Sequence, residues 1–459
     1  MSLRRSPHSK RLALLAACVG VAALVAGCLP PPPPPPAPPT TTRPVPTTTT
    51  LPACPTSSAA ASEQDSPPTP GSQTYTAVVK DERGRAKVVT RQVTSGADVV
   101  RFRADAASRG NVIAFAPDAE VRASAQTESW GFTDDGFRAG WTAASTTGTG
   151  VRVAVLDTGI DSTHPDLAAH LDPAPAGLDL VSKCMNGSGK TVGTPGVASD
   201  PNGHGTHVSG IIAATDDAQG VVGGSPGATI VPVRVLNSSG SGRFSDVAAG
   251  ILWAADKAGG NASVISMSLG GTSDGGVVGA ALATVEDPAN ATYTHPTVVI
   301  AAGNSSGSAP EYPGVYAGDN PFEPPMPQVL AVGALCKPGF VLSPRPGDEC
   351  ASTSGLIASF SSHPWIGTGS PTGVSAPGTS IVSDWPGGGT KVESGTSMAT
   401  PLVAALAALV TAECGGATFG AADVVARIEN TAVDLGTTGP DQVYGFGAIA
   451  PGAALSSCS

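Results

Sequence analysis

Three short segments of this chain carry the side-chain types that acyl transfer needs: a carboxylate, an imidazole and a hydroxyl. Asp157 follows the apolar run VRVAVL, and His204 lies between glycines in NGHGTHV, at the start of an apolar stretch. Ser397 stands in SGTSMATP, a Gly-containing turn before a strongly apolar helix. An Asp can orient an imidazole that acts as general base, and backbone N–H groups at a helix N-terminus favour a developing oxyanion. Together, the three residues predict nucleophilic attack on a carbonyl group.

Each of these residues also has a simpler interpretation when it is taken alone. An Asp after a strand is often a turn or cap residue, and a Ser at a helix start is often an N-cap. His204 and His207 lie one helical turn apart, as metal ligands would, but no neighbouring Glu or further His completes a zinc motif. The prediction of chemistry therefore depends on the three segments occurring together.

The elements that must position these residues alternate along the chain from Gly150 onward. Short β-branched runs such as TIVPVRVL and TVVIAA are followed by Ala-rich helical stretches such as FSDVAAGILWAADKA and SMATPLVAALAALV. This alternation predicts an α/β fold with a mostly parallel sheet flanked by helices on both faces. Ligands of such sheets bind beyond the carboxyl ends of the strands, which is where Asp157 is expected.

Composition limits the classes of partner. The chain has 459 residues, 41% of them apolar, which supports a large buried core. A formal net charge of −11 with 13% charged residues gives no basic stripe, so we expect no nucleic-acid partner.

The first 124 residues are expected to form three successive segments. Residues 1–27 have a basic start and an apolar run typical of an export signal, with a retained membrane anchor as the alternative. Residues 28–72 form a Pro/Thr-rich spacer that cannot bury a core. Residues 73–124 contain strand-like runs that predict a small α+β unit.

The segments around Asp157, His204 and Ser397 resemble those of the subtilisin-like serine proteases. The resemblance covers roughly residues 125–455 and includes the motifs VAVLDTGIDSTHPDL, NGHGTHVSGIIAA, SMSLGG, VVIAAGN, SAPG and SGTSMATP. It implies the three-layer fold of that family over 125–459, with protein or peptide substrates and no organic cofactor. In this resemblance Asp157 orients His204, which activates Ser397, and Asn304 donates to the oxyanion together with the Ser397 backbone N–H.

The same resemblance implies where an extended substrate binds. The two segments that would pair with its backbone and wall the main specificity pocket are Ser268, Leu269 and Gly270, and Ala301, Ala302 and Gly303. Tyr312-Pro313-Gly314 resembles a landmark just past the pocket floor, which places Glu311 at that floor. We expect a preference for Lys or Arg before the cut bond, because a carboxylate in a narrow pocket favours a cation. The alternative is a Glu311 side chain turned to solvent.

A structural calcium site is also implied by the resemblance. Its ligands would be the side chains of Gln126, Asp166 and Asp217 and the carbonyl groups of Thr215, Gln219 and Val221, which are the hard oxygen ligands that calcium prefers. The alternative is a metal-free loop, with Asp166 capping a turn.

The resemblance identifies residues 73–124 as an inhibitory prosegment that the enzyme removes near Ser124-Ala125. Val25-Ala26-Gly27-Cys28 is similar to a bacterial lipobox, which implies export and a lipid on Cys28; ordinary signal cleavage is the alternative.

Six further cysteines are left in an oxidising compartment. We expect Cys336 to pair with Cys350 and Cys414 with Cys458. A bond between Cys54 and Cys184 would keep the processed domain attached to its spacer, and a free buried Cys184 is the alternative.

The alternative class of function is an inactive, surface-anchored binding module that kept the fold. It is considered because fold alone does not give function. We expect the protein to be a monomer.

Overall fold

The structure is a computed structural model that describes residues 73–80, 86–117, 126–171, 177–185, 191–196, 199–317, 326–337, 350, 356–365, 367, 371–415 and 419–456. The expected signal segment and the whole of the spacer lie outside these residues. So do Cys28, Cys54, Cys458 and the cleavage point near Ser124.

A small α+β unit precedes the large domain. Its antiparallel sheet has the order β2-β1-β3. The strands are β1 (Gln73–Lys80), β2 (Ala86–Val93) and β3 (Asn111–Pro117), and helix α1 (Gly96–Ser108) buries Phe102 and Ala106. The α+β character predicted for this region is therefore confirmed.

The large domain is built on a sheet with the strand order β11-β10-β9-β8-β4-β7-β5-β6. Neighbouring strands are parallel except β5 and β6, which form an antiparallel hairpin at one edge. The strands are β4 (Arg152–Asp157), β5 (Leu178–Met185), β6 (Thr191–Pro195), β7 (Thr229–Arg234), β8 (Val264–Met267), β9 (Thr297–Ala301), β10 (Val329–Leu335) and β11 (Val374–Pro377). A separate hairpin joins β12 (Ile381–Trp385) to β13 (Gly389–Glu393).

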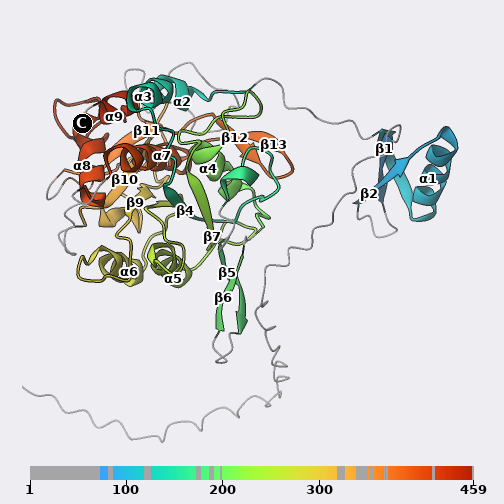
Figure 1. The fold of residues 1–459 in the computed structure, drawn as a ribbon, viewed down its shortest axis with the longest axis horizontal. Coiled ribbons are helices and arrows are strands. Elements are labelled where there is room, and N and C mark those ends of the chain that lie inside the picture. Colours follow the sequence, from blue (N-terminus) through green and yellow to red (C-terminus); the bar gives the residue numbers. More distant parts are fainter. Residues whose placement is uncertain are drawn as a thin grey trace, which may run out of the picture. The chain divides into compact units, whose positions relative to one another are not determined.

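Helices cover both faces of this sheet (Figure 1). One face packs against α4 (His204–Ala213) and α7 (Thr396–Cys414), and the other against α5 (Phe244–Ala255) and α6 (Val277–Glu286). Successive side chains of a strand pack alternately into the two cores. Val153 and Val155 of β4 lie in one core, and Ala154 and Leu156 lie in the other. The predicted three-layer α/β fold is confirmed.

Shorter elements close the domain. They are α2 (Trp130–Asp134), α3 (Phe137–Ala144), α8 (Ala421–Thr431) and α9 (Pro451–Leu455), with single 3-10 turns at Ala168–His170 and Gly314–Tyr316.

Helix α7 is the central helix of the domain. Its 19 residues would be long and apolar enough to cross a membrane, but 72% of its apolar window is buried inside the protein. Its Ala-rich sequence lets it contact β8, β9, β10 and β11 at once. The helix thereby fixes the position of its own first turn, which begins at Thr396.

The described cysteines are all oxidised. Cys336 and Cys350 form the expected disulfide, and Cys184 and Cys414 are also disulfide-bonded. A free Cys184 thiol, the alternative from the sequence, therefore does not occur in this structure.

Candidate active site

Asp157 and His204 meet where strand β4 ends and helix α4 begins. His204 Nδ1 lies 2.8 Å from Asp157 Oδ1 and 3.0 Å from Asp157 Oδ2. Gly205 makes this approach feasible, because a Cβ at that position would lie 2.2 Å from the Gly159 carbonyl oxygen. The Asp157 carboxylate is fully buried, and it also accepts the backbone N–H of Thr158 at 2.7 Å. The carboxylate is thus fixed in place to orient the imidazole.

The charge state of His204 is set by two opposing effects. Burial disfavours the imidazolium, but the negative charge and hydrogen bond of Asp157 favour it, and the pKa of His204 is raised above its ordinary value of 6.5. An imidazole with a raised pKa is a stronger base. The other ring nitrogen, Nε2, is available to a group in the cleft.

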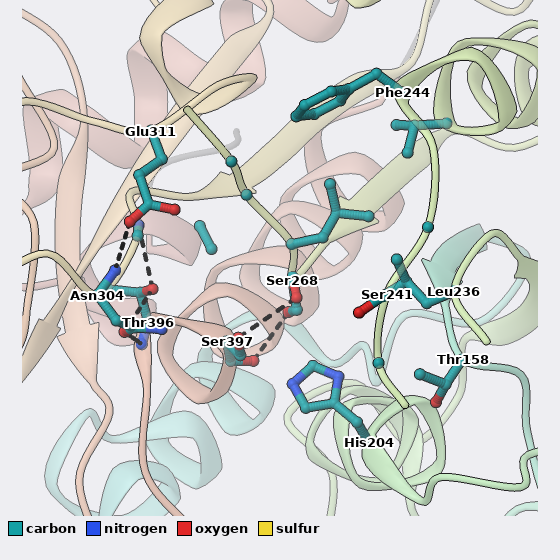
Figure 2. Close-up of a pocket in the computed structure, with 18 of the residues that line it drawn as sticks. Thr158, His204, Leu236, Ser241, Phe244, Ser268, Asn304, Glu311, Thr396 and Ser397 are labelled. Carbon is teal, nitrogen blue, oxygen red and sulfur yellow. Dashed lines mark hydrogen bonds between the residues drawn. The ribbon is translucent and has the colours of Figure 1, made fainter. Parts of the chain in front are cut away.

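Ser397 lies in the first turn of α7, on the cleft side of the sheet. Figure 2 shows its hydroxyl and the His204 ring facing each other across the cleft. In this structure the Ser397 hydroxyl donates to the carbonyl of Ser268 at 3.4 Å, and it forms no hydrogen bond with His204. Catalytic hydrogen bonds are often long or absent before substrate binds, so this geometry fits a resting site.

Two N–H donors converge beside Ser397. Asn304 Oδ1 accepts from the backbone N–H of Thr396 at 3.0 Å and from its hydroxyl at 3.1 Å, which turns the Asn304 Nδ2 donors toward the cleft. A Cβ placed on Gly395 would lie 3.5 Å from Ser397 N and 3.8 Å from Asn304 Nδ2, so both nitrogen atoms lie close to one small volume. That arrangement suits an oxyanion.

The expected substrate segments wall the same cleft, whose volume is about 590 Å³. Ser268, Leu269 and Gly270 follow β8, while Ala301 and Gly303 stand at the end of β9. Ala302 is fully buried behind this wall.

Glu311 points into the cleft between these two segments instead of turning to solvent. A Cβ on Gly303 would lie 2.6 Å from its Cδ, and a Cβ on Gly270 would lie 2.8 Å from its Oε2. The carboxylate therefore occupies space that is open only because residues 270 and 303 are glycines, which have no side chain.

Several residues of the site were not found from the sequence. Leu236 and Phe244 line the cleft (Figure 2), and nothing in their local sequence distinguishes them from core residues. Buried Asp200 accepts hydrogen bonds from the Thr158 hydroxyl, from the backbone N–H groups of Asn202 and Gly203, and from both donors of Thr206. Asp200 thus holds the loop that presents His204. In the sequence, only its position four residues before His204 could have indicated this role.

Four of the residues proposed as calcium ligands lie in one loop, and the other two, Gln126 and Asp166, contact that loop. The Gln126 side-chain amide lies 2.7 Å from the Thr215 carbonyl oxygen and 3.0 Å from that of Val221. Asp166 Oδ2 accepts the Val221 N–H at 3.0 Å, and a Cβ on Gly220 would lie 1.8 Å from the same oxygen. Gln126 Nε2 donates to these two carbonyl groups, and its Oε1 accepts the Ala218 N–H at 3.2 Å. The Asp166 carboxylate and the carbonyl oxygens of Thr215 and Val221 are the kinds of oxygen that a hard cation prefers. Asp217 instead accepts the Gln219 N–H within the loop.

A second acidic group near Asp166 was missed. His164, Asp166 and Asp384 are buried, with one potential ligand atom of each within 4.8 Å of the others. Burial, together with the charge of Asp166, raises the pKa of Asp384 to about 9. Asp384 comes from β12, far away in sequence, so no local motif reveals the pair.

His204 and His207 do not act as a ligand pair. His207 Nε2 lies 3.1 Å from the Lys391 carbonyl oxygen, whereas His204 Nδ1 faces Asp157. Burial, and next the charge of His204, lower the pKa of His207 to about 4, so it is neutral at pH 7. His207 is a core residue of α4.

An oriented base, a serine at a helix N-terminus and two converging N–H donors, all on one edge of a parallel sheet, are the parts of an acyl-transfer site. Comparison with known proteins agrees with this class. Residues 148–447 match the sequence model of the Subtilase family, and the chain belongs to that family.

The matches between this chain and individual relatives cover similar numbers of residues. Subtilisin E from Bacillus subtilis (strain 168) is 39% identical over 307 residues, which are 66% of this chain and 65% of the relative. An alkaline protease from Shouchella clausii is 35% identical over 333 residues, 72% of this chain and 71% of the relative. A subtilisin from Bacillus pumilus is 38% identical over 307 residues, 66% of this chain and 90% of the relative. The chain thus spans slightly less than two thirds of subtilisin E.

Proposed function

We propose that this chain is a serine endopeptidase that uses Asp157, His204 and Ser397. The observation that carries the proposal is the 2.8 Å contact between His204 and a buried Asp157, in the cleft that also holds Ser397. Membership of a family whose relatives are called subtilisin and alkaline protease supports it.

The reaction would proceed through an acyl-enzyme. His204 takes the proton of the Ser397 hydroxyl as its oxygen bonds to the substrate carbonyl carbon. The carbonyl oxygen becomes an oxyanion that accepts hydrogen bonds from Asn304 Nδ2 and the Ser397 N–H. The carbon–nitrogen bond then breaks, and His204 gives its proton to the leaving amine.

Water completes the cycle by the same proton transfers. It gives a proton to His204 while its oxygen bonds to the acyl carbon, and the ester bond to Ser397 then breaks. The proton returns to the Ser397 hydroxyl, so the enzyme ends as it began.

Hydrolysis of casein tests this function. We expect wild-type activity to be abolished by a serine-directed phosphonate and by Ser397→Ala, while Ser456→Ala, at an exposed serine after α9, stays active. Casein left intact by the wild-type protein, with no phosphonate attached to Ser397, would favour the inactive binding module.

We further propose that the protein is exported as a monomeric zymogen. The basic and apolar start of the chain supports export, and so do the oxidised cysteines, because disulfides persist outside the cytosol. Residues 73–124 would inhibit the domain until they are cut off. Mass spectrometry of the N-terminal peptide from the native host separates a lipidated Cys28 from ordinary signal cleavage.

We also propose a structural calcium ion held by Gln126, Asp166, Asp217 and the carbonyl groups of Thr215, Gln219 and Val221. The position of the Gln126 side chain next to two of these carbonyl groups supports the site, and ligation would require the amide to turn so that Oε1 takes the place of Nε2. Bound calcium would neutralise the carboxylates and tie the N-terminal segment to the loop after α4.

A further inference from the structure

Glu311 is held by its backbone between the two walls of the cleft. Its N–H donates to the Ala302 carbonyl at 2.8 Å. The next residue, Tyr312, exchanges two backbone hydrogen bonds with Gly271, at 2.9 and 3.0 Å. Each wall of the cleft therefore holds the backbone of Glu311 and Tyr312 from one side, which fixes the position from which the Glu311 side chain extends.

The carboxylate is anchored on one oxygen only. Oε1 accepts the Asn304 backbone N–H at 3.3 Å and the Ser305 hydroxyl at 2.6 Å. Oε2 faces Gly270, on the other wall. One acceptor oxygen is thus left for a ligand, in a fixed position.

The negative charge of Glu311 is not balanced by a neighbour. Among the residues that the structure describes, no Lys, Arg or His forms an ion pair with it, although Lys183 and Arg234 each pair with an Asp elsewhere in the domain. The hydroxyl and amide that contact Glu311 are neutral. A half-buried carboxylate of this kind favours a cationic partner that enters the cleft.

The slot in which Glu311 lies is next to the reacting groups. Asn304, whose side chain faces the oxyanion position, is the residue whose backbone N–H holds the Glu311 carboxylate. A substrate carbonyl bound beside Ser397 would direct the side chain of the same substrate residue between Gly270 and Gly303. A long side chain can pack its methylene groups on Leu269 and Ala301 and bring its charged end to Oε2.

We propose that Glu311 makes this chain a peptidase that cuts after Lys or Arg. The inference rests on the proposed peptidase function and names its substrate class. A neutral residue of similar length would leave the charge of Glu311 unpaired in a slot from which water is displaced, so it should react more slowly.

The test compares three peptide substrates that differ only in the residue before a p-nitroanilide: Lys, norleucine and Phe. Norleucine has a chain of similar length without the charge. For the wild-type protein we expect kcat/KM for Lys to exceed that for norleucine by about 10-fold or more. In Glu311→Gln the ratio should fall toward one, with the Phe substrate little changed. Glu413→Gln, at an exposed residue near the end of α7, is the matched control and should keep the wild-type ratio.

A second measurement needs no variant. Benzamidine, a planar cation, should inhibit the wild-type protein competitively, and neutral benzamide should inhibit it much less. Norleucine or Phe cleaved as well as Lys, or a ratio unchanged in Glu311→Gln, would overturn the inference. If no peptide is cut and the phosphonate fails to label Ser397, the peptidase function itself is overturned. Labelling and cleavage without selectivity for Lys remove only the role of Glu311.

Discussion

Ser268 and Ser397 exchange hydrogen bonds across the cleft. The Ser268 hydroxyl donates to the Ser397 carbonyl at 2.9 Å, and the Ser397 hydroxyl donates to the Ser268 carbonyl at 3.4 Å. The first bond ties the start of α7 to the segment after β8, and the second is long enough to be weak. The Ser397 hydroxyl can therefore turn to His204 at small cost, while its backbone stays fixed beside the wall that would bind substrate.

The raised pKa of His204 predicts the acid limb of the activity profile. Because the neutral imidazole is the proposed base, kcat/KM should rise with pH through the His204 pKa, with a midpoint above 6.5. Asp157→Asn removes the charge that raises this pKa, so the midpoint should move to lower pH, and kcat should fall by about 10⁴-fold. Rates of peptide hydrolysis measured across pH check both effects. A midpoint unaffected by Asp157→Asn would contradict the assigned pair.

Asn304 should contribute to the transition state more than to substrate binding. Its Nδ2 lies near the position proposed for the oxyanion, which would carry full charge only during reaction. We expect Asn304→Leu to lower kcat by about 10²–10³-fold, equivalent to about 3–4 kcal/mol, with KM little changed. Steady-state kinetics on the preferred peptide provide the measurement. A rise in KM at constant kcat would instead assign Asn304 to ground-state binding.

The sequence predicted the residues that follow parallel strands better than those that come from elsewhere. Asp157 could be placed because a β-branched run leads into it, and the carboxyl ends of parallel strands share one edge. Phe244 and Asp384 could not, because their roles depend on how α5 and the β12–β13 hairpin pack against distant segments. The hydrogen bond from Ser397 to Ser268 also depends on side-chain rotamers, which no motif encodes.

The proposed calcium site predicts that a chelator lowers thermal stability. A ligand present at about 100 times its dissociation constant stabilises the folded state by about 2.7 kcal/mol, and chelation removes this amount. Asp217→Asn should weaken calcium binding and reduce the difference in Tm between calcium and chelator, whereas Glu413→Gln should preserve it. Differential scanning calorimetry of the Ser397→Ala protein avoids self-digestion. Equal Tm values in calcium and chelator would favour the metal-free loop.

The oxidised state of Cys184 leads to a prediction about processing. Cys184 lies in β5, opposite Val192 of β6, and is 2% exposed. Cys184 is disulfide-bonded, and Cys336 and Cys350, which are paired with each other, are not its partner. We expect Cys54 to be that partner, so that the spacer stays attached after the prosegment is cut. A sample shown to be cleaved on a reducing gel should then run as one larger species without reductant.

Two variants make this test specific. Cys184→Ser should release the spacer fragment on both gels, because its only covalent link to the processed domain is gone. The double variant Cys336→Ser with Cys350→Ser, which removes the disulfide within the domain, should keep the larger species. Identical fragment patterns of the wild-type protein with and without reductant would exclude the link, because a disulfide is the only bond in this arrangement that a thiol reductant breaks.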